Sequence, residues 1–332
     1  MTAATAEPTL APEPGSPAGE PSPGLIRVQG MFAKELRGRM RGPRAFTVLS
    51  LYLFFLVGFT LLIYFVTKLA SSSNPTDPVG KPVFLGLVAF QLGLVCFLAP
   101  SFTAGAISGE RERQTYELLM TTPFPLILIL IAKLFAALAY IFLLIFAALP
   151  LLAISLFLGG VAPEEVLIAF LLLCTSAVLF GTIGLCFSAW VRSTIGAATL
   201  AYGAMLIPVV ALPIVAATVV SSFGVILSGN SSPSPTVTGF LYYVGGITLS
   251  ANPFIAGALT ELIISQDKSL FFFTIASPFG AGSGTVLAVG PWLIYLILAT
   301  LATILFFFLA VYLARPTRVG GGRRRGKAPQ GE

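Results

Sequence analysis

The chain has 332 residues, of which 56% are hydrophobic and only 10% are charged, whereas soluble domains carry about 25% charged residues. Composition therefore excludes an ordinary soluble protein and predicts an all-α polytopic membrane protein. The sequence contains no histidine, so it lacks the commonest general base and the commonest metal ligand. Its net charge of +6 is concentrated near the ends of the chain, which indicates membrane topology rather than binding of nucleic acid.

The first 43 residues divide into a tail and a helix. Residues 1–24 are rich in Pro, Ala and Glu and have no basic stretch followed by an apolar one, which predicts a disordered cytoplasmic tail rather than a signal peptide. In residues 25–43, apolar and basic positions form two opposite stripes, which predicts an amphipathic helix in the headgroup plane. This helix is either a generic positive anchor or also touches a cytoplasmic partner. The stripes are Val28, Phe32, Leu36 and Met40, and Lys34, Arg37 and Arg41, with Arg44 just beyond.

A transmembrane domain is predicted over residues 44–314. A span needs about 20 apolar residues, and six clear runs of that length occur, at 45–67, 83–107, 125–158, 166–191, 195–220 and 289–314. The third run contains Pro150, where a kink is expected, and the fifth contains Pro208 and Pro213. Prolines inside spans are tolerated where neighbouring groups satisfy the carbonyls that they free.

Residues 237–264 are apolar enough to form a seventh span, and charge decides against it. Basic residues flank spans on the cytoplasmic side, and they cluster both before the first span and in the tail at 315–332. Both termini are therefore predicted to be cytoplasmic, which requires an even number of spans. Residues 221–288 then lie on the outer side, where Asn252 and Pro253 open a short helix that reaches about Ile264. We expect this helix to be re-entrant or interfacial.

The segment at 108–123, between the second and third spans, is the richest in charge outside the termini. Gly109 is a candidate end for the preceding helix, and Tyr116, Leu119 and Met120 lie on one face of a short helix that closes before Pro123. Such a segment is either a docking element or a solvated loop. Lys133 lies one or two turns inside the third span, where it either reaches toward the headgroups or pairs with a carboxylate at 110–117.

The run GERERQTYELLMTTP at 109–123, followed by IAKL at 131–134, closely resembles the signature of ABC type-2 exporter permeases. That signature is Glu-x-Glu-x-Gly-Thr-x-Glu-x-Leu-Leu-x-x-Pro with a Gly-Lys pair downstream. The present sequence departs from it at Gln114, which is usually Gly, and at Ala132, which is often Gly. The resemblance extends over all six spans, the amphipathic N-terminal helix and the outer region before the last span.

The resemblance implies a half-transporter in which two such permeases pair and each docks a separate ATP-binding subunit, giving two copies of both. ATP and Mg are then cofactors of the partner, and this chain holds none. The location implied is the inner (plasma) membrane, in contact with its lipids. The loop residues implied in coupling are Glu110, Arg111, Glu112, Arg113, Thr115, Tyr116, Glu117 and Leu119. The helix implied to brace the same subunit contributes Phe32, Lys34, Leu36, Arg37 and Arg41.

Two other functions are disfavoured by the residues. An ion-coupled secondary transporter usually places ionisable groups near the middle of the membrane, and none lies mid-span here. An intramembrane enzyme would need a metal site or an acid–base pair, which the composition does not supply. Because the spans carry no charge to receive a charged solute, the expected cargo is hydrophobic or amphipathic, such as a peptide, a lipid or an apolar drug.

Overall fold

The computed structural model describes residues 43–70, 79–121, 125–228, 235–267, 270–275 and 286–315. Within these residues, six helices are long and apolar enough to cross a membrane, which confirms the predicted all-α polytopic fold. Five are continuous and one is broken, and all lie within a few residues of the predicted runs. The continuous spans are α2 (Pro43–Ala70), α3 (Gly80–Glu112), α5 (Leu126–Phe157), α6 (Pro163–Trp190) and α11 (Pro291–Ala314). The broken one, Thr194–Val219, consists of three successive helical segments, α7, η2 and α8, which are described below.

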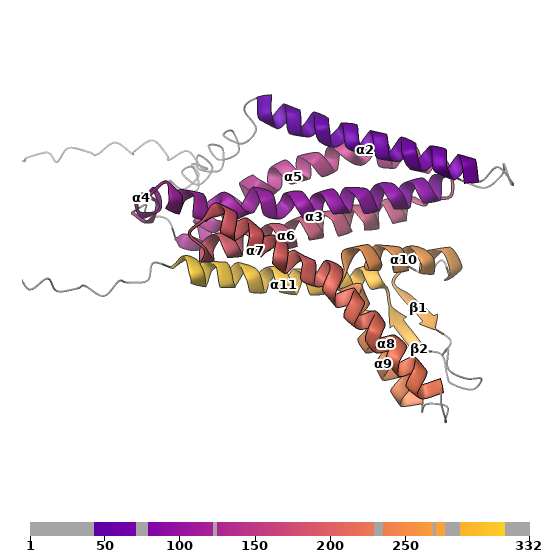
Figure 1. Cartoon of the computed structure of the whole chain (residues 1–332). Coiled ribbons are helices and arrows are strands. Elements are labelled where there is room, and N and C mark those ends of the chain that lie inside the picture. Colours follow the sequence, from indigo (N-terminus) through magenta and orange to yellow (C-terminus); the bar gives the residue numbers. More distant parts are fainter. Residues whose placement is uncertain are drawn as a thin grey trace, which may run out of the picture.

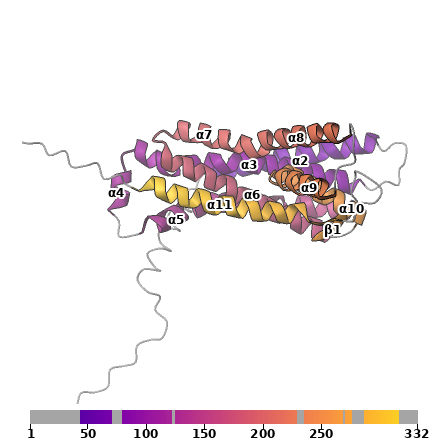
Figure 2. The ribbon, with the colours of Figure 1, turned by 90° about the horizontal axis from the view of Figure 1, so that it is seen from below.

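The predicted tail at 1–24, the body of the amphipathic helix at 25–43, and the basic tail beyond Arg315 lie outside the described residues. The long helices run side by side in a bundle, with the short helix α4 (Tyr116–Met120) at one end (Figures 1 and 2). We call this end the α4 end and the opposite one the far end. α5 passes Pro150 as a single continuous helix.

Helix α6 forms the centre of the bundle, where it packs against α3, α5, α7, α10 and α11. Its closest approach is to α3. A Cβ added to Gly184 would lie only 3.0 Å from the Cα of Pro100 and 2.1 Å from Oγ1 of Thr103. A side chain at position 184 would therefore force the two helices apart. Close packing of this kind is the main source of association between helices in lipid.

The fifth span is broken by a π-helical segment. α7 (Thr194–Leu206) is followed by η2 (Ile207–Ala211) and then by α8 (Leu212–Ser228). The N–H of Leu212 donates to the carbonyl of Ile207, five residues back, and Pro213 has no N–H to offer. The carbonyls of Pro208 and Val209 therefore lose the donors that a regular α-helix would give them, and the side-chain amide of Asn252 donates to both, over 3.2 and 2.7 Å. This is the compensation expected for prolines within a span.

Helices α9 (Pro235–Ser250) and α10 (Pro253–Asp267) follow, and the chain bends by 119° between them. Oδ1 of Asn252 accepts hydrogen bonds from the N–H groups of Phe254 and Ile255, which confirms the predicted N-cap. α10 continues beyond the predicted end at Ile264. Figure 1 shows α8 and α9 leaning away from the bundle as a pair, while α10 lies against its far end.

A two-stranded antiparallel hairpin precedes the last span, and the sequence did not predict it. β1 (Phe272–Ile275) pairs with β2 (Val286–Val289), with Phe272 opposite Val289. Val289 was predicted as the first residue of the sixth span. It instead ends β2, and α11 begins at Pro291, whose ring suits the first helical position. Apolar strand residues and apolar span residues are indistinguishable by hydropathy, which explains the error.

Candidate functional site

Helix α3 is longer than a membrane span requires. Its 33 residues span about 50 Å, against about 30 Å for the hydrocarbon core of a bilayer. The helix ends at Glu112 rather than at Gly109, which was the predicted end. The N–H of Gln114 donates to the carbonyl of Arg111, and the N–H of Thr115 donates to the carbonyl of Glu110. These two bonds form a Schellman motif, which closes the helix three residues later than predicted.

Gln114 has the left-handed backbone that this motif requires, with φ of 59°. Among the described residues it is the only one other than glycine with positive φ. Left-handed backbone is free of strain only for glycine. This is the position at which the signature usually has Gly, so the departure noted in the sequence has a physical meaning.

We expect Gln114→Gly to raise the free energy of unfolding by about 0.5–1 kcal/mol, because it relieves the left-handed strain. Arg113→Gly is the matched control, since Arg113 is exposed, one residue earlier, and has φ of −83°. That control should lower stability, because glycine gains nothing there and its unfolded chain is more flexible. Chemical denaturation of the two purified variants measures both effects. If the two glycine variants changed the free energy of unfolding equally, Gln114 would not be under left-handed strain.

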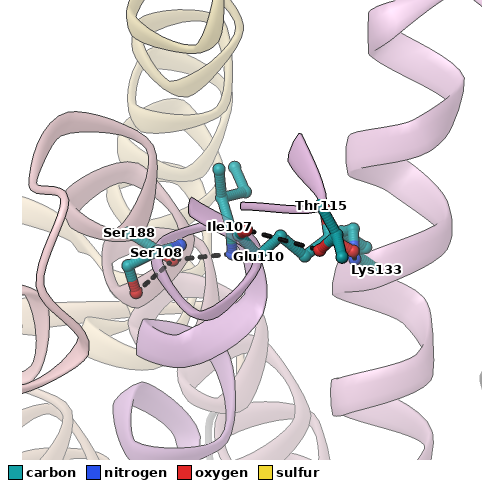
Figure 3. Close-up of polar contacts among 6 residues, drawn as sticks. All are labelled: Ile107, Ser108, Glu110, Thr115, Lys133 and Ser188. Carbon is teal, nitrogen blue, oxygen red and sulfur yellow. Dashed lines mark hydrogen bonds and ion pairs between the residues drawn. The ribbon is translucent and has the colours of Figure 1, made fainter. Parts of the chain in front are cut away.

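The charged segment is tied first to α5, through Lys133. Nζ of Lys133 lies 2.5 Å from Oε1 of Glu110 (Figure 3), and the Lys133 side chain is only 6% exposed. Of the two alternatives for this lysine, the structure therefore forms the ion pair. A buried ammonium is costly unless it is paired. The ion pair fixes the end of α3 against the first two turns of α5.

The same segment holds the start of α7. The backbone N–H of Thr194 donates to Oε1 of Glu112 over 2.7 Å, and its hydroxyl donates to Oε2. The first N–H groups of a helix have no partner within the helix, and its N-terminus carries a partial positive charge. A carboxylate placed there accepts hydrogen bonds from these N–H groups and is attracted by the positive charge. Thr194 was not among the predicted site residues, although Ser193-Thr194 could have been recognised as a helix start.

α4 is tied to the end of α11. The hydroxyl of Tyr116 donates to the carbonyl of Ala314, one of the last carbonyls of α11, which have no partner within the helix. The guanidinium of Arg111 lies over the Tyr116 ring, 4.8 Å from its centre, a cation–π distance. The first residue of α4 therefore contacts both α3 and α11.

A serine of α6 completes the arrangement. Oγ of Ser188 accepts from the N–H groups of Ile107 and Ser108, over 2.9 and 3.0 Å. Figure 3 shows this serine on one side of α3 and Lys133 on the other. Ser188 is fully buried and lies 80 residues from Ser108 in sequence, so no local pattern could indicate it.

The remaining predicted site residues are on the surface of the segment. Arg113, Thr115 and Glu117 are exposed, and Thr115 also donates to the carbonyl of Glu110. Leu118, an apolar side chain at the end of the bundle, is 73% exposed and was not among the predicted site residues. The side chain of Leu119 lies outside the described part of the chain. So do the five predicted residues of the N-terminal helix, Phe32, Lys34, Leu36, Arg37 and Arg41.

Six spans, of which α3, α5, α7 and α11 meet at one charged segment, define a multi-pass membrane protein. The family model described as "ABC-2 family transporter protein" matches residues 30–317, which is most of the chain. The chain belongs to this family, which confirms the resemblance seen in the sequence. It is an ABC-type membrane permease, and the family associates with an ABC ATP-binding subunit. A search of curated proteins finds none that matches.

Proposed function

We propose that this chain is the membrane subunit of an ATP-driven exporter, with ATP hydrolysed by a separate subunit that docks on the α4 segment, residues 108–121. The observation that carries the proposal is the set of contacts around this segment. Glu110 binds α5, Glu112 binds α7, and Tyr116 binds α11. A partner that moves α4 would therefore move four spans at once, counting α3, to which the segment is covalently joined.

Charge supports an orientation with the α4 end in the cytoplasm. Arg111, Arg113, Arg192 and Arg315 lie at that end, whereas Lys68 and Lys81 lie at the far end. Arginine and lysine are enriched on the cytoplasmic side of spans. We place the protein in the inner (plasma) membrane with both termini in the cytoplasm. The complex proposed contains two permease copies and two ATP-binding subunits.

The cargo that we propose is hydrophobic or amphipathic: a peptide, a lipid or a drug-like molecule. Apolar side chains are exposed along α2, along the broken span and along α11. Within the described bundle, polar contacts between spans include the neutral pair of Ser176 and Tyr295, whose hydroxyl oxygens are 2.7 Å apart. Both hydroxyls are buried and bonded to each other, so this contact between spans carries no charge that would attract an ionic solute.

The test is reconstitution with the ATP-binding subunit. We expect the purified chain alone to hydrolyse no ATP, and the complex to do so. Leu118→Ser should weaken binding of that subunit about tenfold, because exposed apolar anchors commonly contribute 1–3 kcal/mol to an interface. Phe157→Ser is the matched control: it removes a 91% exposed apolar side chain at the far end. Affinity is measured by titration in nanodiscs.

Two results would count against the proposal. ATP turnover by the single purified chain would place the hydrolytic site here. Equal affinities of Leu118→Ser, Phe157→Ser and the wild type would make the α4 segment a connector, and docking would then have to be sought on the N-terminal helix.

A further inference from the structure

A second charged cluster lies at the far end of the bundle, remote from the α4 segment. Lys81 is the second residue of α3, Glu165 lies in the first turn of α6, and Glu261 lies within α10. Nζ of Lys81 is 2.7 Å from Oε1 of Glu261 and 3.6 Å from Oε1 of Glu165. The cluster therefore joins the outer helix α10 to two spans of the bundle.

The charges of this cluster do not balance. Two carboxylates face a single ammonium, and the side chains of Glu165 and Glu261 are only 5% and 8% exposed. Oε2 of Glu165 is buried and has no hydrogen-bond partner in the described structure. A buried carboxylate without full compensation costs several kcal/mol, and such a group commonly binds a proton instead.

Among the described residues, Lys81 is the only basic side chain within ion-pair distance of Glu165 or Glu261. Glu164 is the neighbouring titratable group on α6, and it is exposed and negative. Thr260 precedes Glu261 in α10, and its hydroxyl accepts a hydrogen bond from the N–H of Trp292 in α11. Both are neutral. The side chain of Lys81 is 27% exposed, so water reaches the cluster from the far end of the bundle.

We propose that Lys81, Glu165 and Glu261 form a proton-binding latch, in which one proton held by the buried Glu165 carboxyl group balances the charges and keeps α10 against α3 and α6. Both carboxylates contact the same Nζ, so they are neighbours. When the proton leaves to solvent, two negative charges repel each other beside one ammonium, and α10 is released. Because Asn252, the N-cap of α10, also holds the broken span through Pro208 and Val209, release reaches that span as well. The latch does not depend on the proposed export function.

Thermal unfolding across pH tests the proton. The unfolded chain releases glutamate protons near pH 4.3, so a proton kept only by the folded protein makes stability fall as pH rises above that value. Glu165→Gln leaves Lys81 and Glu261 as a balanced pair, and Glu261→Gln does the same for Lys81 and Glu165. We expect the Tm of the wild type to fall by about 3 °C or more relative to both variants between pH 5 and 8. Glu164→Gln, which alters the adjacent exposed carboxylate, should follow the wild type.

Movement of α10 is tested in the same nanodiscs by thiol labelling. Ala256 of α10 is fully buried, so Ala256→Cys, in a background without the three native cysteines, reports exposure of the helix. At alkaline pH, the Ala256→Cys protein should be labelled several-fold faster than the same protein that also carries Glu165→Gln. Parallel pH profiles of Tm in the wild type and both glutamine variants would overturn the bound proton. If the glutamine variants lose the pH dependence of Tm but labelling of Ala256→Cys does not change with pH, the proton is bound but the latch is wrong.

Discussion

Reversing the charge at position 110, in Glu110→Lys, is expected to lower the free energy of unfolding by about 2–4 kcal/mol. Lys133 is almost fully buried and lies 2.5 Å from the Glu110 carboxylate, so the variant places two ammonium groups together in a site with little water. Glu110 itself is 25% exposed, and partial hydration keeps the cost below that of a fully buried pair. In the assembled transporter, substrate-stimulated ATP hydrolysis should fall more than tenfold.

The exchange Glu110→Lys with Lys133→Glu is the decisive companion, because it restores opposite charges at the same positions. It should recover more than half of the lost stability. Glu117→Lys makes the same change of charge on an exposed residue of α4 and should leave stability near that of the wild type. Chemical denaturation of the wild type, the two single reversals Glu110→Lys and Lys133→Glu, and the swapped protein gives the coupling energy of the pair. A swapped protein no more stable than Glu110→Lys would show that this ion pair contributes nothing.

Replacing Asn252 is expected to have an effect at least as large, of about 3–7 kcal/mol for Asn252→Ala. The side chain is 2% exposed and takes part in four hydrogen bonds. The alanine variant removes the cap of α10 and leaves the carbonyls of Pro208 and Val209 unsatisfied. Each buried carbonyl without a partner costs about 1–3 kcal/mol, and loss of a cap costs about 1 kcal/mol. Chemical denaturation again provides the measurement.

Two further variants separate these roles. Asn252→Asp keeps an oxygen that accepts from Phe254 and Ile255 but replaces the donating amide with a carboxylate that repels the two carbonyls. Asn252→Ser keeps a shorter cap. If the carbonyls of the broken span matter most, Asp should be no better than Ala, and protection of α7 and α8 from hydrogen exchange should fall. An Asp variant as stable as wild type would assign the whole effect to the cap.

The features that the sequence predicted are those with strong local signals. A run of about 20 apolar residues has few outcomes other than a span, which is why the six spans were placed within a few residues. The start of α10 was predicted for a similar reason: Asn252 followed by Pro253 combines a capping side chain with a ring that suits the first helical turn. The charged segment at 108–123 was recognisable by its composition and its resemblance to the family signature.

The features that were missed depend on tertiary contacts. Glu112 finds Thr194, 82 residues away, and Tyr116 finds Ala314, 198 residues away. No spacing along the chain encodes such partners. Glycine often terminates helices, which made Gly109 a candidate end, but α3 continues to Glu112, and Ser188 of α6 contacts the N–H groups of Ile107 and Ser108 just before Gly109. The cluster of Lys81, Glu165 and Glu261 could not be predicted for the same reason, because its three residues come from three different helices.

Helix α3 carries a residue of both charged sites, since Lys81 lies in its first turn and Glu110 and Glu112 lie in its last. Two binding events that act on one continuous helix are thermodynamically linked whenever either shifts its position. If occupation of the proton site alters the affinity of the α4 end for its partner by some factor, binding of that partner must alter the proton affinity by the same factor. Docking a subunit at one membrane face would then take up or release protons at the other.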